Sequence, residues 1–147
     1  MIVVHVAGFS GSGKTEVSLR LAPLAAREGC LGYLKSHHAG LEREGSNTAR
    51  MAPHAALRLL AGSDGTLALG ERLSLEQLLV QAQRAGCDVA LVEGFKRSAG
   101  AKLWLRRDRD DAPPEGVEDV TLDLVGTDAL SMPLEELWRI VPRRTFL

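Results

Sequence analysis

Residues 8–15 read Gly-Phe-Ser-Gly-Ser-Gly-Lys-Thr and match the phosphate-binding pattern G-x-x-x-x-G-K-[ST] at every fixed position. In this pattern the glycines let backbone N–H groups approach phosphate oxygens, and the following helix contributes its positive dipole end. We expect Lys14 to reach the β- and γ-phosphates and Thr15 to place its hydroxyl on Mg²⁺. The predicted nucleotide-binding residues of this loop are Gly8, Ser10, Gly11, Ser12, Gly13, Lys14 and Thr15.

The sequence on either side of the loop supports this interpretation. The apolar run at residues 2–6 predicts a strand that leads directly into Gly8. Apolar residues at helical spacing then predict a helix from about Lys14 to Arg27, kinked by Pro23. The alternative is a glycine-rich turn without a ligand, and the order strand, loop, helix favours the nucleotide site.

A second element of the predicted site lies at Glu93-Gly94, directly after the apolar strand 88–92. Mg²⁺ keeps several waters when bound, so one carboxylate near Thr15 is enough to hold it. We therefore predict Thr15 and Glu93 as metal ligands, Lys14 and Glu93 as catalytic residues, and the Gly94 backbone as a phosphate contact. The alternative for Glu93 is a structural salt bridge.

The remaining pattern alternates strands with helices. Further strands are expected at 31–35, 66–69, 101–106 and 120–124, and further helices at 47–60, 74–85 and 133–141. This order predicts one α/β domain over residues 1–147, a P-loop NTPase with a mostly parallel sheet between two helical layers. Ligands bind such sheets at the carboxyl ends of the strands. Residues 107–116 are charged and contain two prolines, so we expect a solvated hairpin loop there.

Composition limits the partners and the compartment. The 147 residues carry a net charge of −1, so a nucleic-acid partner, which favours a basic excess, is not expected. No apolar stretch approaches the ~20 residues that span a bilayer, and a strand from Ile2 leaves no room for a signal peptide. We therefore expect a cytoplasmic protein, in which Cys30 and Cys87 are buried thiols and not a disulfide or metal site.

Several motifs together resemble a known family, the molybdopterin-guanine dinucleotide biosynthesis adapter proteins (MobB). The matching elements, in chain order, are the loop 8–15, Pro23, Lys35 followed by His37-His38, Val92-Glu93-Gly94-Phe95-Lys96, and the strand 102–106. The resemblance implies a homodimeric GTP-binding protein with slow GTPase activity. It also implies molybdopterin, or its guanine dinucleotide form, as a ligand, and the guanylyltransferase that attaches GMP to molybdopterin as a partner.

The resemblance also bears on individual residues. It favours His37 as a ligand contact, although a solvated histidine pair is the alternative from chemistry alone. Lys96 is expected to face a phosphate or a partner, with simple solvation as the alternative. The family's G-K-D-[ST] string is replaced by residues 45–48, Gly-Ser-Asn-Thr, and its late strand-plus-aspartate element is not placed by the sequence. The choice between GTP and ATP therefore stays open at this point.

Two alternatives stay open beside the adapter interpretation. A P-loop small-molecule kinase needs a base for its acceptor and a lid that carries arginines, and neither is evident. A metallochaperone built on His37 and His38 lacks a second cluster of metal ligands.

Trp104 alternates with Leu103 and Leu105 in its predicted strand. We therefore expect its side chain to be either exposed at an interface or buried under the last helix.

Overall fold

The structure is a computed structural model that describes residues 1–36, 45–50, 53–54, 58–63, 65–69 and 72–147. These residues form two compact units, Met1–Ser36 with Leu75–Leu147, and His37–Ser74. Across the described ranges, no helix is long and apolar enough to cross a lipid bilayer. The expectation of a single domain over residues 1–147 stays a prediction.

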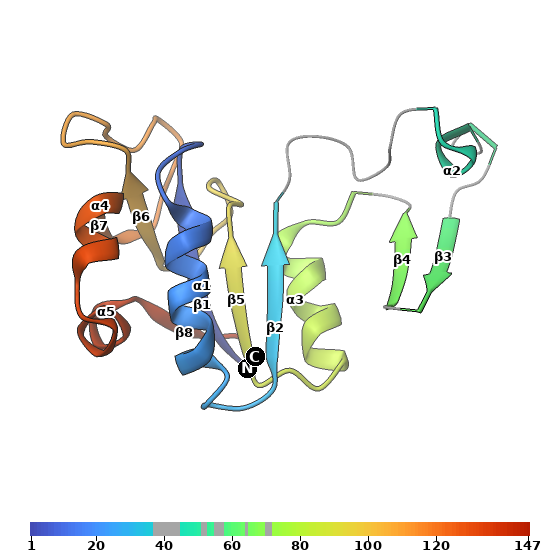
Figure 1. Cartoon of the computed structure of the whole chain (residues 1–147), viewed down its shortest axis with the longest axis horizontal. Helices are drawn as coiled ribbons and strands as arrows, with labels where there is room; N and C mark the ends of the chain where they lie inside the picture. Colours follow the sequence, from blue (N-terminus) through green and yellow to red (C-terminus); the bar gives the residue numbers. More distant parts are fainter. Residues whose placement is uncertain (37–44, 51–52, 55–57, 64, 70–71) are drawn as a thin grey trace. The chain divides into compact units, whose positions relative to one another are not determined.

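The first unit is built on a parallel sheet with β1 at its centre. The strands along the sheet are β2 (Leu31–Lys35), β5 (Val89–Glu93), β1 (Ile2–Gly8), β6 (Lys102–Arg106) and β7 (Val120–Val125), which all run parallel. The short strand β8 (Arg143–Thr145) pairs antiparallel with the first half of β1. The two termini meet there, where Met1 and Phe146 exchange backbone hydrogen bonds (Figure 1). The prediction of a mostly parallel sheet is confirmed.

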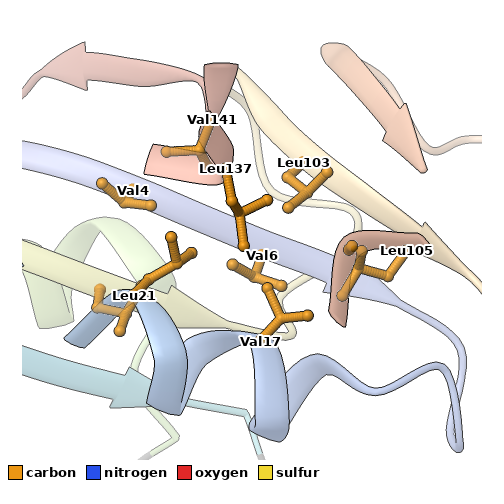
Figure 2. Close-up of a cluster of buried hydrophobic side chains, with 10 residues drawn as sticks. Val4, Val6, Val17, Leu21, Leu103, Leu105, Leu137 and Val141 are labelled. Carbon is orange, nitrogen blue, oxygen red and sulfur yellow. The ribbon is translucent and has the colours of Figure 1, made fainter. Parts of the chain in front are cut away.

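Helices cover both faces of this sheet. They are α1 (Lys14–Ala25), α3 (Leu75–Arg84), α4 (Gly126–Ser131) and α5 (Leu134–Ile140). Successive residues of a strand point to opposite faces, so Val3 and Val4 enter different cores. Val4 packs with the α1 and α5 side of the sheet (Figure 2), whereas Val3 packs against Leu79 of α3. The predicted arrangement of three layers is therefore confirmed, and burial on both faces explains why the central strands are apolar throughout.

The second unit contains an antiparallel hairpin. Its elements are α2 (Asn47–Arg50), β3 (Arg58–Gly62) and β4 (Gly65–Leu69), and β3 pairs with β4. The strand expected at 66–69 is confirmed as β4, but the helix expected over 47–60 is wrong at residues 53–54, which form a turn, and at residues 58–60, which belong to β3. A short apolar run such as Leu59-Leu60 does not distinguish a helix from a strand, and pairing with β4 decides the outcome here.

The connection between β6 and β7 also differs from the prediction. The two strands are parallel, so residues 107–119 cross back over the length of the sheet and do not form a hairpin. Helix α4 and strand β8 were not expected, because short elements of three to six residues carry little periodicity. The predicted strands 31–35 and 120–124 and the predicted helices from Lys14, Ser74 and Pro133 are confirmed within a few residues.

Trp104 and the two cysteines correct expectations about burial. Trp104 is fully buried, and its ring system stands nearly perpendicular to the Phe9 ring with centroids 5.4 Å apart. It lies on the opposite sheet face from Leu103 and Leu105, which pack with α5, so it is neither exposed nor under the last helix. Cys30 and Cys87 are free thiols, as expected, but Cys30 is exposed and Cys87 only partly covered. Both precede the strands β2 and β5, where the chain enters the sheet from solvent.

Candidate nucleotide-binding site

The glycine loop joins the carboxyl end of the central strand β1 to the start of α1. A Cβ atom at Gly8 would lie 2.4 Å from the Leu105 carbonyl oxygen and 2.7 Å from Ser12 Oγ, so only glycine fits there. Gly11 and Gly13 have φ angles of 78° and 83°, in the left-handed region that glycine adopts most readily. These conformations turn the chain sharply before α1 begins at Lys14, and they place the loop at the ligand-binding edge of the sheet.

Several donors of the loop converge on the Phe9 carbonyl oxygen. Lys14 Nζ donates to it, and Ser12 Oγ donates to it at 2.9 Å. Partial burial lowers the pKa of Lys14, an effect that the nearby Glu93 carboxylate opposes. Of the remaining predicted loop residues, Ser10 and Gly11 are exposed on the surface of the loop.

Thr15 and Glu93 are in direct contact, as the sequence predicts for a metal site. Thr15 Oγ1 donates to Glu93 Oε1 at 2.9 Å, and the Glu93 side chain is only 3% exposed. Burial alone raises the pKa of Glu93, but hydrogen bonds from Tyr33, Lys35 and Thr15 outweigh it and hold the pKa below its usual value. Glu93 is therefore a buried and ionised carboxylate beside the last residue of the glycine loop.

Tyr33 and Lys35 of β2 belong to this cluster. The sequence does not indicate a site role for Tyr33, and it indicates Lys35 only through the family resemblance. Tyr33 Oη donates to Glu93 Oε2, and burial together with this bond raises the pKa of Tyr33. Lys35 Nζ lies 3.0 Å from Glu93 Oε1 and 3.1 Å from Thr15 Oγ1. Lys35 pairs with Glu93 in the register of β2 and β5, which places Tyr33, two residues earlier, on the same sheet face.

The segment after β5 is fixed to the central strand. The Gly94 N–H donates to the Val6 carbonyl at 3.0 Å, and the Gly94 carbonyl accepts from His5 Nε2 at 2.7 Å. A contact from the Gly94 N–H to a phosphate therefore requires the bond to Val6 to break, and it stays a prediction. The next residue, Phe95, has a φ of 44°, which holds this turn in a strained conformation.

Positive charge gathers around the loop. Lys96 Nζ lies 5.6 Å from the centre of the Phe9 ring, and the Arg107 guanidinium carbon lies 5.0 Å from the same centre. Lys35 and Lys96 are both close enough to Lys14 to lower its pKa further by repulsion. An edge that concentrates ammonium groups in this way attracts anions such as phosphates.

The start of α4, directly after β7, packs against the glycine loop. A Cβ atom at Gly126 would lie 2.1 Å from the Ser12 carbonyl oxygen, so glycine is required where α4 begins. Asp128 follows in the first turn of α4 with an exposed side chain. This strand followed by an aspartate has the form of the late element that the sequence alone did not place.

The ligand chemistry of the cluster suits Mg²⁺. Within the residues that the structure describes, no three or more His, Cys, Asp and Glu side chains gather into a metal-binding group. One carboxylate and one hydroxyl, at Glu93 and Thr15, are what a Mg²⁺ ion needs when it keeps several waters and binds phosphate oxygens. The expected ligand residue His37, and His38 beside it, lie outside the described residues.

A glycine loop between a central parallel strand and a helix, with a hydroxyl and a carboxylate beside it, defines the P-loop NTPase class of α/β proteins. The chain belongs to the family described as molybdopterin guanine dinucleotide synthesis protein B (MobB), which matches residues 3–126. It is 31% identical over 140 residues to the molybdopterin-guanine dinucleotide biosynthesis adapter protein of Haemophilus influenzae, which covers 90% of this chain and 76% of that protein.

Solved MobB structures share the fold. The crystal structure of Bacillus subtilis MobB has a TM-score of 0.61 at 22% identity and covers 97% of this chain and 99% of that one. The MobB homologue from Bacillus stearothermophilus has a TM-score of 0.62 at 20% identity and covers 93% of this chain and 95% of that one. The family resemblance seen in the sequence is thus confirmed, and the chain is an adapter of the molybdopterin guanine dinucleotide pathway.

Proposed function

We propose that this adapter binds GTP with Mg²⁺, hydrolyses it slowly, and assists the guanylyltransferase that attaches GMP to molybdopterin. The observation that carries the proposal is the hydrogen bond of 2.9 Å between Thr15 and Glu93 beside the glycine loop. A hydroxyl and an ionised carboxylate in contact, next to backbone N–H groups and Lys14, form the combination that a metal-bound triphosphate needs.

In this proposal each residue of the site has a role that follows from its chemistry. The glycine loop wraps the phosphates, and Lys14 exchanges the Phe9 carbonyl for β- and γ-phosphate oxygens. Thr15 and Glu93 hold Mg²⁺, which when bound neutralises phosphate charge and orients the triphosphate. Lys96 supplies further positive charge at the same edge of the sheet.

The preference for guanine is proposed to come from Asp128. Guanine presents two neighbouring donors, N1–H and N2–H₂, which a single carboxylate accepts together, whereas adenine presents an acceptor at N1. Asp128 is exposed and follows Gly126, which touches the glycine loop through Ser12. A carboxylate in this position therefore favours GTP over ATP.

Slow hydrolysis of GTP follows from the role that this proposal gives to the Glu93 carboxylate. Glu93 is committed to Thr15 and to the metal, and in the described part of the chain no other carboxylate hydrogen-bonds to Thr15 or Lys14. In this proposal the carboxylate beside the loop serves the metal and does not position the attacking water. We propose turnover of GTP alone far below the ~10 s⁻¹ median of enzymes. A homodimer, contact with molybdopterin or its guanine dinucleotide form, and a cytoplasmic location complete the proposal.

A reconstituted assay tests the adapter function directly. Purified guanylyltransferase, molybdopterin, GTP and Mg²⁺ are combined with and without this protein, and the guanylated cofactor is quantified. We expect the parent protein to raise the yield and Lys14→Ala, which loses the phosphate-binding ammonium, to raise it much less. Thermal melts of both proteins control for folding. Rapid phosphorylation of a small metabolite by the chain alone, with no effect on the transferase, would establish the kinase alternative instead.

A further inference from the structure

Lys35 occupies the position of a cation between the two groups proposed to hold Mg²⁺. Its Nζ atom lies 3.0 Å from Glu93 Oε1 and 3.1 Å from Thr15 Oγ1, and these two oxygens are 2.9 Å apart. The ammonium, hydroxyl and carboxylate oxygen therefore form a closed triangle of hydrogen bonds. We infer that Lys35 is a resident counter-ion of the metal site, which Mg²⁺ must displace from Thr15 and Glu93. This inference rests on the function proposed above.

The competition follows from the atoms that the two cations share. The Thr15 hydroxyl donates its proton to Glu93 and accepts a hydrogen bond from Lys35. A Mg²⁺ ion on the same hydroxyl lies about 2.1 Å from the oxygen, which places it within a few ångströms of the ammonium that bonds that oxygen. Both cations also neutralise the same carboxylate charge. Two positive charges held this close without screening repel each other, so binding of the metal and retention of the ammonium exclude each other.

The burial of the partners shows which of them moves. Glu93 is 3% exposed and is held at its second oxygen by Tyr33, so its charge is fixed and requires a nearby cation. The Lys35 side chain is 37% exposed and extends from the edge strand β2 on a flexible four-carbon stem. Lys35 can therefore leave for solvent, whereas Glu93 stays in place. The carboxylate keeps one positive neighbour in either state.

Displacement of Lys35 also changes the charge available to phosphates. Lys35 already lies close enough to Lys14 for the two ammonium groups to repel each other and lower the pKa of Lys14. Once released from Glu93 into solvent, its ammonium still stands at the edge of the sheet that carries the glycine loop, where the phosphates of the proposed ligand would attract it. Binding of the metal would thus free Lys35, as a second lysine beside Lys14, to contact the phosphates. Binding of the metal and binding of the nucleotide would then strengthen each other.

Binding of Mn²⁺ to the protein without nucleotide tests this exchange. Mn²⁺ serves as a probe for Mg²⁺ because its free concentration can be followed by electron paramagnetic resonance. We expect Lys35→Met, which keeps the length of the side chain but removes its charge, to bind Mn²⁺ about tenfold more tightly than the parent. Adding Glu93→Gln to Lys35→Met should abolish this gain, because the carboxylate is then absent.

A matched control removes one positive charge elsewhere. Arg27 follows α1 with a side chain that is 70% exposed and pairs only loosely with Glu135 at 3.6 Å. Arg27→Met changes the net charge by the same amount as Lys35→Met, and it should leave Mn²⁺ binding at the parent level. A gain in both variants would show a general effect of charge and overturn the inference.

The inference is also wrong if folded Lys35→Met binds Mn²⁺ no more tightly than the parent. If this variant fails to fold in thermal melts, Lys35→Gln, which keeps a hydrogen-bond donor, replaces it in the same titration with the same expectation. A separate titration of the parent with GTP and Mg²⁺ distinguishes the two proposals. If the parent binds no GTP, the proposed function fails. If it binds GTP and neither Lys35 variant gains Mn²⁺ affinity, only the displacement by metal fails.

Discussion

The Thr15 hydroxyl donates a hydrogen bond of 2.9 Å to the Glu93 carboxylate across 78 positions of the chain. The contact exists because β1 and β5 are parallel neighbours, so the loop after one strand and the last residue of the other meet at the same edge. Thr15 follows β1 through the glycine loop, and Glu93 is the last residue of β5. The polar cluster is thus a product of strand order.

The charge of Glu93 should control the dependence of nucleotide binding on Mg²⁺. Glu93→Gln keeps the shape of the side chain and one acceptor oxygen, for either Tyr33 or Thr15, but removes the negative charge that the metal needs. We expect the ratio of GTP affinities with Mg²⁺ and with a chelator to fall towards one in the variant. Calorimetric titration under both conditions measures this ratio, and thermal melts confirm that the variant folds. Identical ratios in variant and parent would assign Glu93 a structural role.

Asp128 should control the choice between GTP and ATP. Asp128→Asn replaces one of the two carboxylate acceptors by a donor that faces the donors of guanine. Because a hydrogen bond to a charged group is worth about 1.5–3 kcal/mol, GTP affinity should fall roughly 10- to 100-fold, with ATP affinity unchanged or higher. Competition titrations with both nucleotides measure the selectivity. Glu136→Gln, which removes an exposed carboxylate on α5, is the matched control.

A comparison with the sequence shows which parts of the site were accessible to prediction. Lys14 and Thr15 were found because the loop motif is local, and Glu93 was found because it ends an apolar strand. Tyr33 carries no such signal, and Lys35, at the end of the predicted strand 31–35, is indicated only by the family resemblance. The contacts of both residues with Glu93 depend on β2 lying beside β5. The order of strands in a parallel sheet depends on how helices cross over it, and residue patterns within each strand do not specify it.

The prediction of the fold was limited in the same way, because residue patterns describe single elements and not their pairing. Long strands and helices were predicted within a few residues because their hydrophobic periodicity extends over several turns or pleats. The helix expected through Leu60 was wrong because a short apolar run fits both structures, and pairing with β4 selected the strand. The hairpin expected at 107–116 was wrong for a related reason. Prolines and charges indicate a loop but not the direction in which the next strand runs.

Arg20 should stabilise the fold by joining α1 to α4. Its guanidinium donates to the carbonyls of Ala129 at 2.7 Å, Leu130 at 2.8 Å and Met132 at 2.6 Å. These carbonyls lie at the end of α4, where the last turn has no helical partners for them. Arg20→Met should therefore lower the free energy of unfolding by roughly 1–3 kcal/mol.

Urea denaturation of Arg20→Met and of the parent measures this loss. The matched control is Arg27→Met, just after the end of α1, because Arg27 and Glu135 form an ion pair in which both side chains are largely exposed. That variant should change stability by less than about 0.5 kcal/mol. Equal effects of the two substitutions would show that the contacts of Arg20 with α4 contribute nothing beyond an ordinary surface arginine.

His5 should make the stability of the protein depend on pH between about 4 and 6.5. The ring is fully buried in β1 and bonds Gly94 at 2.7 Å through Nε2. Burial, opposed by this hydrogen bond and assisted by repulsion from Lys102 and Arg144, lowers the pKa of His5 from 6.5 to about 4. Between these values the unfolded chain binds more protons than the folded one, so the free energy of unfolding rises with pH and levels off above 6.5.

The size of the effect and a matched pair of variants make this prediction testable. A pKa difference from 6.5 to about 4 corresponds to about 3 kcal/mol of stability, present above pH 6.5 and lost as the pH falls through 4. His5→Gln keeps a donor for Gly94 but does not titrate, so its unfolding free energy should lose this part of the pH dependence. His54→Gln removes an exposed histidine and should follow the parent curve. Urea denaturation of the three proteins from pH 4 to 8 measures the curves, and a constant difference between parent and His5→Gln would contradict the role assigned to His5.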